Sequence, residues 1–459
     1  MKILMYIVCA TLLIAACAKD DQSAAEPQTA HAAVTFGVSE VQPISRTGFE
    51  GELDEWFMRA TGFGVYAYVS HEGNLWLDDK GNDDPADDEF NGASWTPDFM
   101  LNEHVTYESS EGWVYRPLKY WPNQAATGSD PVDVLGGGSA TTTGNIDRVS
   151  FFAYAPYVDQ SLVAYDDPAE AMTAAADPAF TGEGILSLPS ATTTGTPKIA
   201  YSVARRPAFS PDLMYGVAAR RYTSDESAGR EGADVEAGMP LTDMTKVLAG
   251  DRLDYRFCHA LTRLVIYADA IDNMEVPEDF NNLRIVINNI TISDTPAGGQ
   301  LLYKRGVLSL QNTEAGTPLW EDIAGPVGSM GDYLSTTMKR SDEGVFTNTY
   351  FAHQPLGVTT TEQSVFGLGV DGRTAAALFF IAGPVPDPYT PPTITVDYSV
   401  IRRTALEPFG YTETRVANTL ELEGVTFAPS ETTVLRLHFD LNEKDPILVV
   451  DSSKYTEQW

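Results

Sequence analysis

The stretch Val34-Thr35-Phe36-Gly37-Val38 alternates apolar residues with small or polar ones near the start of the chain. Because successive side chains of a β-strand point to opposite faces of a sheet, this pattern predicts a strand with one buried face. The same period of two returns further along the chain, at residues 65–69, 393–400 and 435–441. Helical periodicity is scarce and predicts only short helices, near residues 53–60 and 167–175. The sequence therefore predicts an all-β fold.

Long polar segments rich in turn-forming residues separate the expected strands, a combination that is typical of β-sandwich domains. The chain has 459 residues, which is enough for two or three domains of ordinary size. Between residues 223 and 241, Gly, Glu, Asp and Ser displace the apolar residues, and we expect a domain boundary there. We therefore predict two tandem β-sandwich domains of transthyretin-like or Greek-key topology, at residues 34–230 and 231–459.

The first residues have the pattern of a bacterial lipoprotein signal peptide. One basic residue precedes an apolar run that is too short to span a membrane, and the run ends Leu13-Ile14-Ala15-Ala16-Cys17. This lipobox predicts cleavage between Ala16 and Cys17 and a lipid on the Cys17 thiol. We expect residues 1–16 to be the signal peptide and residues 17–33 to be a flexible tether. An ordinary signal peptide with an incidental cysteine is the alternative interpretation.

The charge balance of the chain excludes one class of partner. Asp and Glu total 64 against 30 Lys and Arg, so the formal net charge is −34. A protein that binds nucleic acid needs a cationic face that releases counterions, so we expect no nucleic acid partner. Of the three cysteines, Cys9 leaves with the signal peptide and Cys17 takes the lipid. Cys258 then remains alone, so we expect it to be a small core residue and expect no disulfide framework.

Catalytic and metal-binding signatures are absent from the sequence. It has no Gly-x-Ser-x-Gly elbow, no His-Glu-x-x-His motif and no Walker loop, and its six histidines are not at metal-ligand spacing. We therefore expect no catalysis and no cofactor, although the paired carboxylates of a glycoside hydrolase stay open in so acidic a chain. An acidic run holds weak calcium candidates, for which a solvated loop is the alternative: Asp83, Asp84, Asp87 and Asp88.

Aromatic residues are concentrated in one part of the chain. Trp95, Trp113 and Trp121 lie close together in sequence, and four more rings follow between residues 151 and 157. We expect these rings to pack in the core, because large aromatic side chains fill the space between sheets well. The alternative is an exposed platform that stacks on sugars, which would make the chain a glycan-binding surface lipoprotein of a nutrient-uptake system.

Several short motifs follow one another in order along most of the chain. They are the lipobox at Cys17, Val34-Thr35-Phe36, Arg46-Thr47-Gly48-Phe49, residues 62–68, Tyr120-Trp121-Pro122, residues 149–156, residues 211–214, residues 257–264 and Phe427-Ala428-Pro429. Each motif is short, but the ordered set resembles the fimbrillin (Mfa-like) family. The members of that family are the subunit lipoproteins of type V pili in Bacteroidetes. The acidic residues that follow Cys17 also resemble the surface-export signal of lipoproteins from these bacteria.

This resemblance implies assembly by strand exchange. In the family an arginine-specific protease cuts after an arginine that follows the first strand, and the strand then leaves. The matching bond here lies between Arg46 and Thr47, and Arg59 is a nearby rival. The strand that would leave carries Val34, Phe36 and Val38. A C-terminal strand of the next subunit would then fill the opened groove, by β-augmentation.

The donor strand implied by the resemblance is an apolar segment close to the end of the chain. Its residues are Ile447, Leu448, Val449 and Val450. The alternative is that this segment pairs as a last strand within its own domain. Few residues follow the expected strand that ends at Leu441, which favours an accessory or tip subunit over the main stalk.

The resemblance thus predicts a structural or adhesive pilus subunit rather than an enzyme. Its expected partners are other pilin subunits, the outer-membrane lipid through Cys17, and a receptor on a host or bacterial surface. Its expected location is the outer membrane and then the cell-surface fimbrium, with the lipid holding the chain during export.

Overall fold

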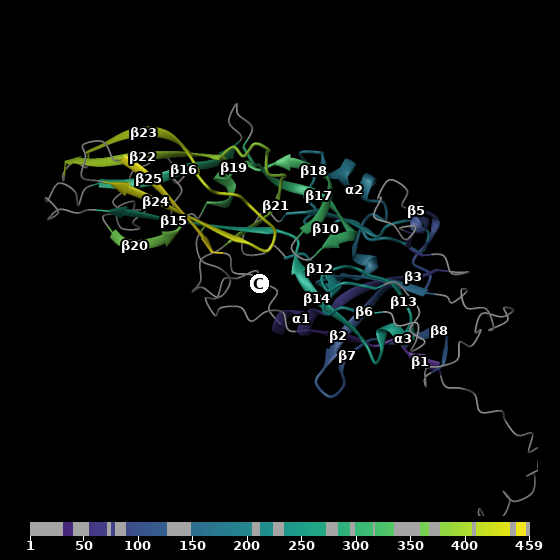
Figure 1. The fold of residues 1–459 in the computed structure, drawn as a ribbon. Helices are drawn as coiled ribbons and strands as arrows, with labels where there is room; N and C mark the ends of the chain where they lie inside the picture. Colours follow the sequence, from purple (N-terminus) through teal and green to yellow (C-terminus); the bar gives the residue numbers. More distant parts are fainter. Residues whose placement is uncertain are drawn as a thin grey trace, which may run out of the picture.

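The computed structural model describes residues 31–39, 55–70, 75–78, 89–125, 148–203, 212–223, 234–271, 283–293, 299–314, 317–334, 359–366, 377–405, 410–440 and 447–455. Strands dominate these residues, and the body is elongated (Figure 1). The helices are short: α1 (Glu55–Thr61), α2 (Pro168–Ala175), α3 (Lys246–Ala249) and the 3-10 turns η1 (Asn91–Ser94), η2 (Gln160–Leu162) and η6 (Gly331–Tyr333). The all-β fold predicted from the sequence is therefore confirmed. None of the described helices is long and apolar enough to cross a membrane.

The first large sheet, here called the N-terminal sheet, runs in the order β2-β14-β12-β9-β3-β6-β7, and β13 also pairs with β9. Its strands are β2 (Phe36–Val38), β3 (Phe63–Ser70), β6 (Met100–Glu108), β7 (Gly112–Val114), β9 (Arg148–Ala155), β12 (Met214–Ala218), β13 (Leu241–Met244) and β14 (Leu253–His259). All its neighbouring strands are antiparallel except β2 and β14, which are parallel. Two short pairs lie outside it: β1 (His31–Ala33) with β8 (Tyr120–Ala125), and β4 (Leu77–Asp78) with β5 (Glu89–Phe90).

The second large sheet, here called the C-terminal sheet, runs in the order β10-β11-β17-β21-β15-β24-β25, with β18 on β17 and β20 on β15. Its strands are β10 (Gly184–Ile185), β11 (Lys198–Ser202), β15 (Thr262–Ile271), β17 (Leu302–Glu314), β18 (Thr317–Pro326), β20 (Thr359–Ser364), β21 (Leu378–Ala382), β24 (Thr432–Asp440) and β25 (Ile447–Tyr455). A four-stranded sheet packs against it, in the order β19 (Gly328–Ser329), β16 (Leu283–Ser293), β22 (Thr393–Ala405) and β23 (Gly410–Glu421). Tyr398 and Phe439 meet between these two sheets, with ring centroids 4.9 Å apart.

The middle of the N-terminal sheet is buried on both faces. In β3 every residue is buried, because alternate side chains enter two different cores. Phe63 and Val65 join the core beneath β2, whereas Tyr66 and Tyr68 join a larger core that also contains strands of the other sheets. β2 therefore packs on a layer of side chains that is itself supported by the larger core on the opposite face of the sheet.

The order of the strands in the two large sheets does not follow the order of the sequence. β10 and β11 precede residue 230 but belong to the C-terminal sheet, whereas β13 and β14 follow it but belong to the N-terminal sheet. The boundary between residues 230 and 231 and the tandem-sandwich arrangement stay predictions. The two helices expected from the sequence are present as α1 and α2, and the Asp167 side chain caps α2 by accepting from the Ala169 N–H at 2.8 Å.

Candidate functional site

The candidate site is the position that β2 occupies at the edge of the N-terminal sheet. Phe36, Gly37 and Val38 pair in parallel with Leu253, Asp254 and Tyr255 of β14. The ladder continues at both ends, where the Leu253 N–H donates to the Thr35 carbonyl and the Ser39 N–H to the Tyr255 carbonyl, each at 2.9 Å. Only three residue pairs form this ladder, so main-chain pairing by itself holds β2 weakly.

Side chains on the inner face of β2 add most of the contact. Phe36 is 4% exposed and lies against four rings, with centroids 5.6 to 6.3 Å away: Phe63, Tyr115, Phe151 and Tyr255. Aromatic pairs at such distances contribute about 0.5–1.5 kcal/mol each beyond the burial of their area. Val34 is also fully buried, whereas Thr35 between them is exposed. Val34 and Phe36 therefore lie on a buried face as the sequence predicts, whereas Val38 is half-buried and Gly37 on the outer face is buried too. Phe36 is the main apolar anchor of the strand.

A neighbouring loop secures the start of the strand. The Tyr115 hydroxyl donates to the Val34 carbonyl at 2.9 Å, and the Val34 N–H donates to the Lys119 carbonyl at 2.9 Å. Burial raises the pKa of Tyr115 to about 12, so its phenol keeps the proton that it donates at neutral pH. On the outer face, the Thr35 hydroxyl donates to the Asp251 carbonyl at 2.6 Å.

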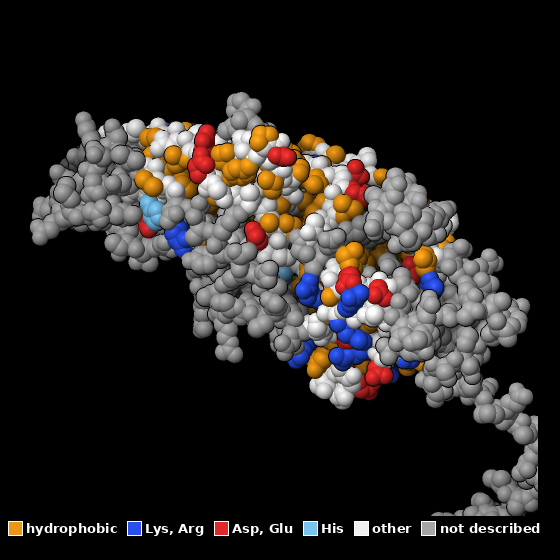
Figure 2. Space-filling model, viewed as in Figure 1, with side chains coloured by type: hydrophobic (Ala, Val, Ile, Leu, Met, Phe, Trp, Pro, Cys, Tyr) orange, Lys and Arg blue, Asp and Glu red, His pale blue; other side chains and the backbone are white. Residues whose placement is uncertain are grey.

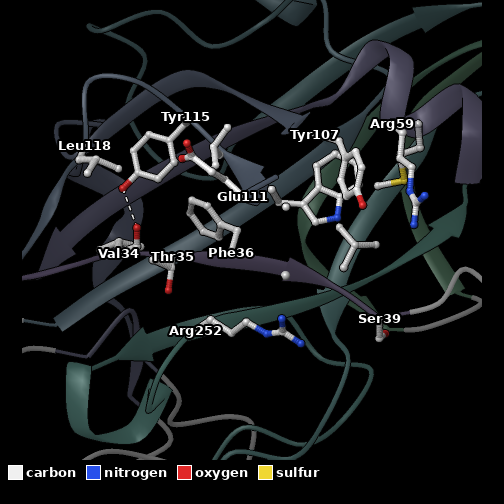
Figure 3. Close-up of a pocket in the computed structure, with 16 residues that line it drawn as sticks. Val34, Thr35, Phe36, Ser39, Arg59, Tyr107, Glu111, Tyr115, Leu118 and Arg252 are labelled. Carbon is white, nitrogen blue, oxygen red and sulfur yellow. Dashed lines mark hydrogen bonds between the residues drawn. The ribbon is translucent and has the colours of Figure 1, made fainter. Parts of the chain in front are cut away.

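A groove of about 530 Å³ runs beside β2, on the side away from β14 (Figure 3). Because both main-chain groups of Gly37 pair with β14, those of Phe36 and Val38 point the other way, towards this groove. Trp113 of β7 and Leu118 line the groove, and the latter is 45% exposed. The edge of β2 thus faces an open, partly apolar space, which is the condition for pairing with a further strand.

Cations gather around this region in an otherwise acidic chain. Figure 2 shows Lys and Arg side chains over the part of the body where β2, β7 and β14 lie, although the net charge is −34. Arg59 and Arg252 both line the groove, and the Arg59 guanidinium lies 4.4 Å from the centre of the Tyr107 ring. The groove therefore combines an apolar floor with a charged rim, in which two arginines outnumber the single carboxylate of Glu111.

The predicted processing and ligand residues lie outside the described part of the chain. These residues are Ala16, Cys17, Arg46, Thr47, Asp83, Asp84, Asp87 and Asp88. Lipidation, cleavage and calcium binding therefore stay predictions. In the sequence, the bond after Arg46 falls between β2 and α1, and the rival Arg59 lies in the last turn of α1.

The predicted donor residues, Ile447 to Val450, begin β25. This strand pairs with β24 in antiparallel register over nine residues, from Asp440 opposite Ile447 to Thr432 opposite Tyr455. Leu448 is 3% exposed and packs in the core, whereas Val449 is 52% exposed. The segment thus pairs within its own sheet, and it could serve as a donor only after leaving β24, so that role stays a prediction.

The tryptophans considered as a sugar platform do not form one. Trp121 is 3% exposed and packs on Phe151, and Trp113 packs between Phe63 and Tyr107. Trp95 is partly buried and packs against a different tryptophan in the larger core. Trp121 thus lies in the core as expected, whereas Trp95 and Trp113 are half-buried. Because Trp95 packs against the larger core and Trp113 and Trp121 belong to the core beneath β2, the structure does not bring the three rings together.

The remaining residues considered for chemistry have structural surroundings. His259 is 2% exposed, and its Nδ1 contacts the buried Asp212 carboxylate; Cys258 is half-buried against the larger core. His438 pairs with Asp269 across β24 and β15 at 2.7 Å. Among the residues that the structure describes, no three His, Cys, Asp or Glu side chains gather as metal ligands would.

Sequence reasoning missed the residues that hold β2 in place. Tyr115 bonds a strand that lies 81 residues away, and Asp251 bonds Thr35 across 216 residues. Arg252 and Asp254, which lie over the outer face of Gly37, are equally distant in sequence. No local sequence pattern identifies these residues. A side chain that contacts a strand far away in the sequence does not produce a hydrophobic periodicity in its own segment.

Comparisons with known proteins show which proteins this chain is similar to. No family model matches the chain. The fimbrium subunit Fim1C of Phocaeicola vulgatus is 24% identical over 382 residues, which are 82% of this chain and 73% of that protein. A crystal structure of a fimbrial protein from Bacteroides vulgatus has a TM-score of 0.50 at 16% identity and covers 92% of this chain and 99% of that chain. The chain is thus similar to a fimbrium subunit along most of its length, which confirms the resemblance predicted from its motifs, and it shares the fold of a fimbrial protein.

A more distant match is the fimbrial anchor protein Mfa2 from Porphyromonas gingivalis. It has a TM-score of 0.26 at 9% identity and covers 93% of this chain and 97% of that chain. At that level of similarity the match supports no statement about this chain.

Proposed function

We propose that this chain is a structural or adhesive subunit of a type V cell-surface pilus, and that it assembles by exchange of its N-terminal strand segment around β2. The similarity to the fimbrium subunit supports the pilus role. The observation that carries the exchange is that β2 is a three-residue edge strand, held mainly by Phe36 on an apolar floor. The chain acts as an accessory or tip subunit at the surface of the cell, with other pilin subunits as its partners.

The physical case for exchange rests on what the departure of β2 would expose. Phe63, Phe151 and Tyr255 would lose their cover, and the main-chain groups of β14 would lose their partners. Leaving one such side chain in water costs about 1.5–3 kcal/mol, and an unpaired strand edge attracts another strand. A second strand that fills the empty position restores both the apolar burial and the main-chain pairing. Filling of this position is therefore favourable once β2 has been cut from the body and has left.

Delivery follows from the predicted lipobox. Lipid on Cys17 would hold the exported chain at the outer membrane until Arg46 is cut. After cleavage the lipid would depart with residues 17–46, so the lipid delivers the subunit and is not its final attachment. The adhesive role would then involve a receptor on a host or bacterial surface.

The test is cleavage of the purified full chain by an arginine-specific protease, followed by mass spectrometry of the N-terminus and electron microscopy of polymers. We expect a new N-terminus at Thr47, and polymers once a partner subunit is added. Arg46→Lys keeps the charge but removes the cleavage site, so this variant should stay intact and monomeric, and Arg59→Lys is the matched control. Polymers that retain an intact N-terminus would refute the exchange.

A further inference from the structure

The outer face of β2 is covered at one position, above Gly37. A Cβ atom built there would collide with Oδ1 of Asp254 and would lie 2.8 Å from Nε and 3.0 Å from Cζ of Arg252. Figure 3 shows Arg252 on the side of the strand opposite to Phe36. Such contacts are closer than real Cβ atoms tolerate, so a larger residue would force the cover to move.

Space, and not backbone conformation, accounts for the glycine. Gly37 is not among the glycines with positive φ, and its neighbours Phe36 and Val38 continue an ordinary strand. An alanine at this position would therefore meet no conformational penalty. The three atoms nearest to such a Cβ all belong to Arg252 and Asp254.

The cover is held in place from behind. Asp254 is 9% exposed and accepts a hydrogen bond from Arg220 Nε at 3.0 Å, and Arg252 Nε lies 2.6 Å from its other oxygen. Arg220 is itself positioned over the Tyr222 ring at 4.4 Å, and it donates to the Ala249 carbonyl at 3.1 Å. Because Arg220 fixes the Asp254 carboxylate, only the more exposed Arg252 side chain is able to move aside easily.

We propose that Arg252 and Asp254 select glycine at the centre of any strand that occupies the β2 position, so that the incoming partner carries an apolar-glycine-apolar sequence. The partner's identity rests on the strand exchange proposed above. Inward positions equivalent to Phe36 and Val38 take apolar side chains on the floor, and the residue between them lies under the cover. Overpacking at a tight site reduces an equilibrium constant by about tenfold or more.

This selection excludes one candidate donor. The donor segment implied by the resemblance, residues 447–450, contains no glycine. That segment of a second copy would therefore be a poor occupant of the β2 position, and we infer that the occupant is a glycine-containing strand of another pilus subunit.

The first experiment measures amide hydrogen exchange of residues 31–39 in the uncut full chain. Gly37→Ala should accelerate it by about tenfold or more. In a background with Arg252→Ala and Asp254→Ala, the same substitution should change it by less than about twofold. Thr35→Ser, on the same outer face but at an exposed position, keeps the hydroxyl that donates to the Asp251 carbonyl and is the matched control. Equal acceleration by Gly37→Ala in both backgrounds, or none in either, would overturn the proposal.

The second experiment uses protease-cut protein and two synthetic peptides of residues 31–39, one with glycine and one with alanine at position 37. The cut chain should bind the glycine peptide about tenfold more tightly, and the double-alanine background should lose this preference. Equal binding of both peptides to the unmodified cut chain would overturn the selection of glycine. Failure to bind either peptide, together with the expected result in the uncut chain, would uphold that selection but refute strand exchange and the inferred partner.

Discussion

Replacement of Phe36 by alanine should loosen β2 while leaving the rest of the N-terminal sheet in place. The side chain is 4% exposed and contacts four rings of the floor. Removal of a buried phenylalanine costs about 3–5 kcal/mol in typical cores. At about 1.4 kcal/mol for each factor of ten, the population of the opened strand should rise by about 100-fold to about 5000-fold.

Amide hydrogen exchange followed by mass spectrometry measures this change directly. Peptides that cover residues 31–39 should exchange faster in Phe36→Ala by that factor, because local opening exposes their amides. Peptides that cover β9, in the middle of the same sheet, should change by much less. Phe152→Ala is a matched control, since this equally buried ring of β9 packs in the other core. It should weaken the whole body without a selective effect on β2.

The reasoning has a clear point of failure. If Phe36→Ala accelerates β9 as much as residues 31–39, the strand opens only together with the whole sheet. The strand would then not be a separable unit, and its exchange after cleavage would lose its physical basis.

Three further predictions test other parts of the structure. Burial raises the pKa of Asp243 from its ordinary value of 3.8 to about 6, so the wild type should lose about 2–3 kcal/mol of stability as pH rises from 4 to 7. Asp243→Asn keeps an acceptor for the main-chain N–H of Trp76, and urea unfolding of this variant should no longer show the loss of stability between pH 4 and pH 7. An unchanged pH dependence would contradict the raised pKa of Asp243. Tyr115→Phe removes the donor to Val34 and should destabilise β2 by about 1 kcal/mol, measured by exchange of residues 31–39, and no change there would show that the hydrogen bond is dispensable. In β25, Leu448→Ala should lower the free energy of unfolding in urea by about 2–5 kcal/mol, because this side chain is buried. The exposed Val449→Ala should lower it by less than about 0.5 kcal/mol. Equal losses would mean that the register of β25 with β24 is wrong.

Part of the candidate site was predictable because it depends on patterns among neighbouring residues. The alternation around Phe36 identified the strand and its inner face, since burial of one face of a sheet requires a period of two. The short helix α2 was predictable in the same way, and Asp167 is the cap that its sequence offers. Trp121 was expected in the core and lies there, whereas its neighbour Tyr120 is 51% exposed.

Other parts depend on contacts between distant segments. The parallel partner of β2 is β14, which begins more than 200 residues later in the chain. β10 and β11 join the C-terminal sheet although both lie before the boundary expected at residue 230. Hydrophobic periodicity predicts that a strand has a buried face, but it does not predict which strand pairs with it.

The sequence by itself determined that the chain is a β protein, that a strand with Phe36 on its buried side lies near the start, and that its motifs resemble fimbrial subunits. Tertiary structure alone decided that this strand lies at a sheet edge, that Tyr115 holds its beginning, and that Arg252 and Asp254 cover Gly37. The physical reason is the range of the interactions. Side-chain alternation is a property of consecutive residues. The sheet edge, the groove and the cover over Gly37 exist only after β2 has packed against segments that lie 81 and 216 residues further along the chain.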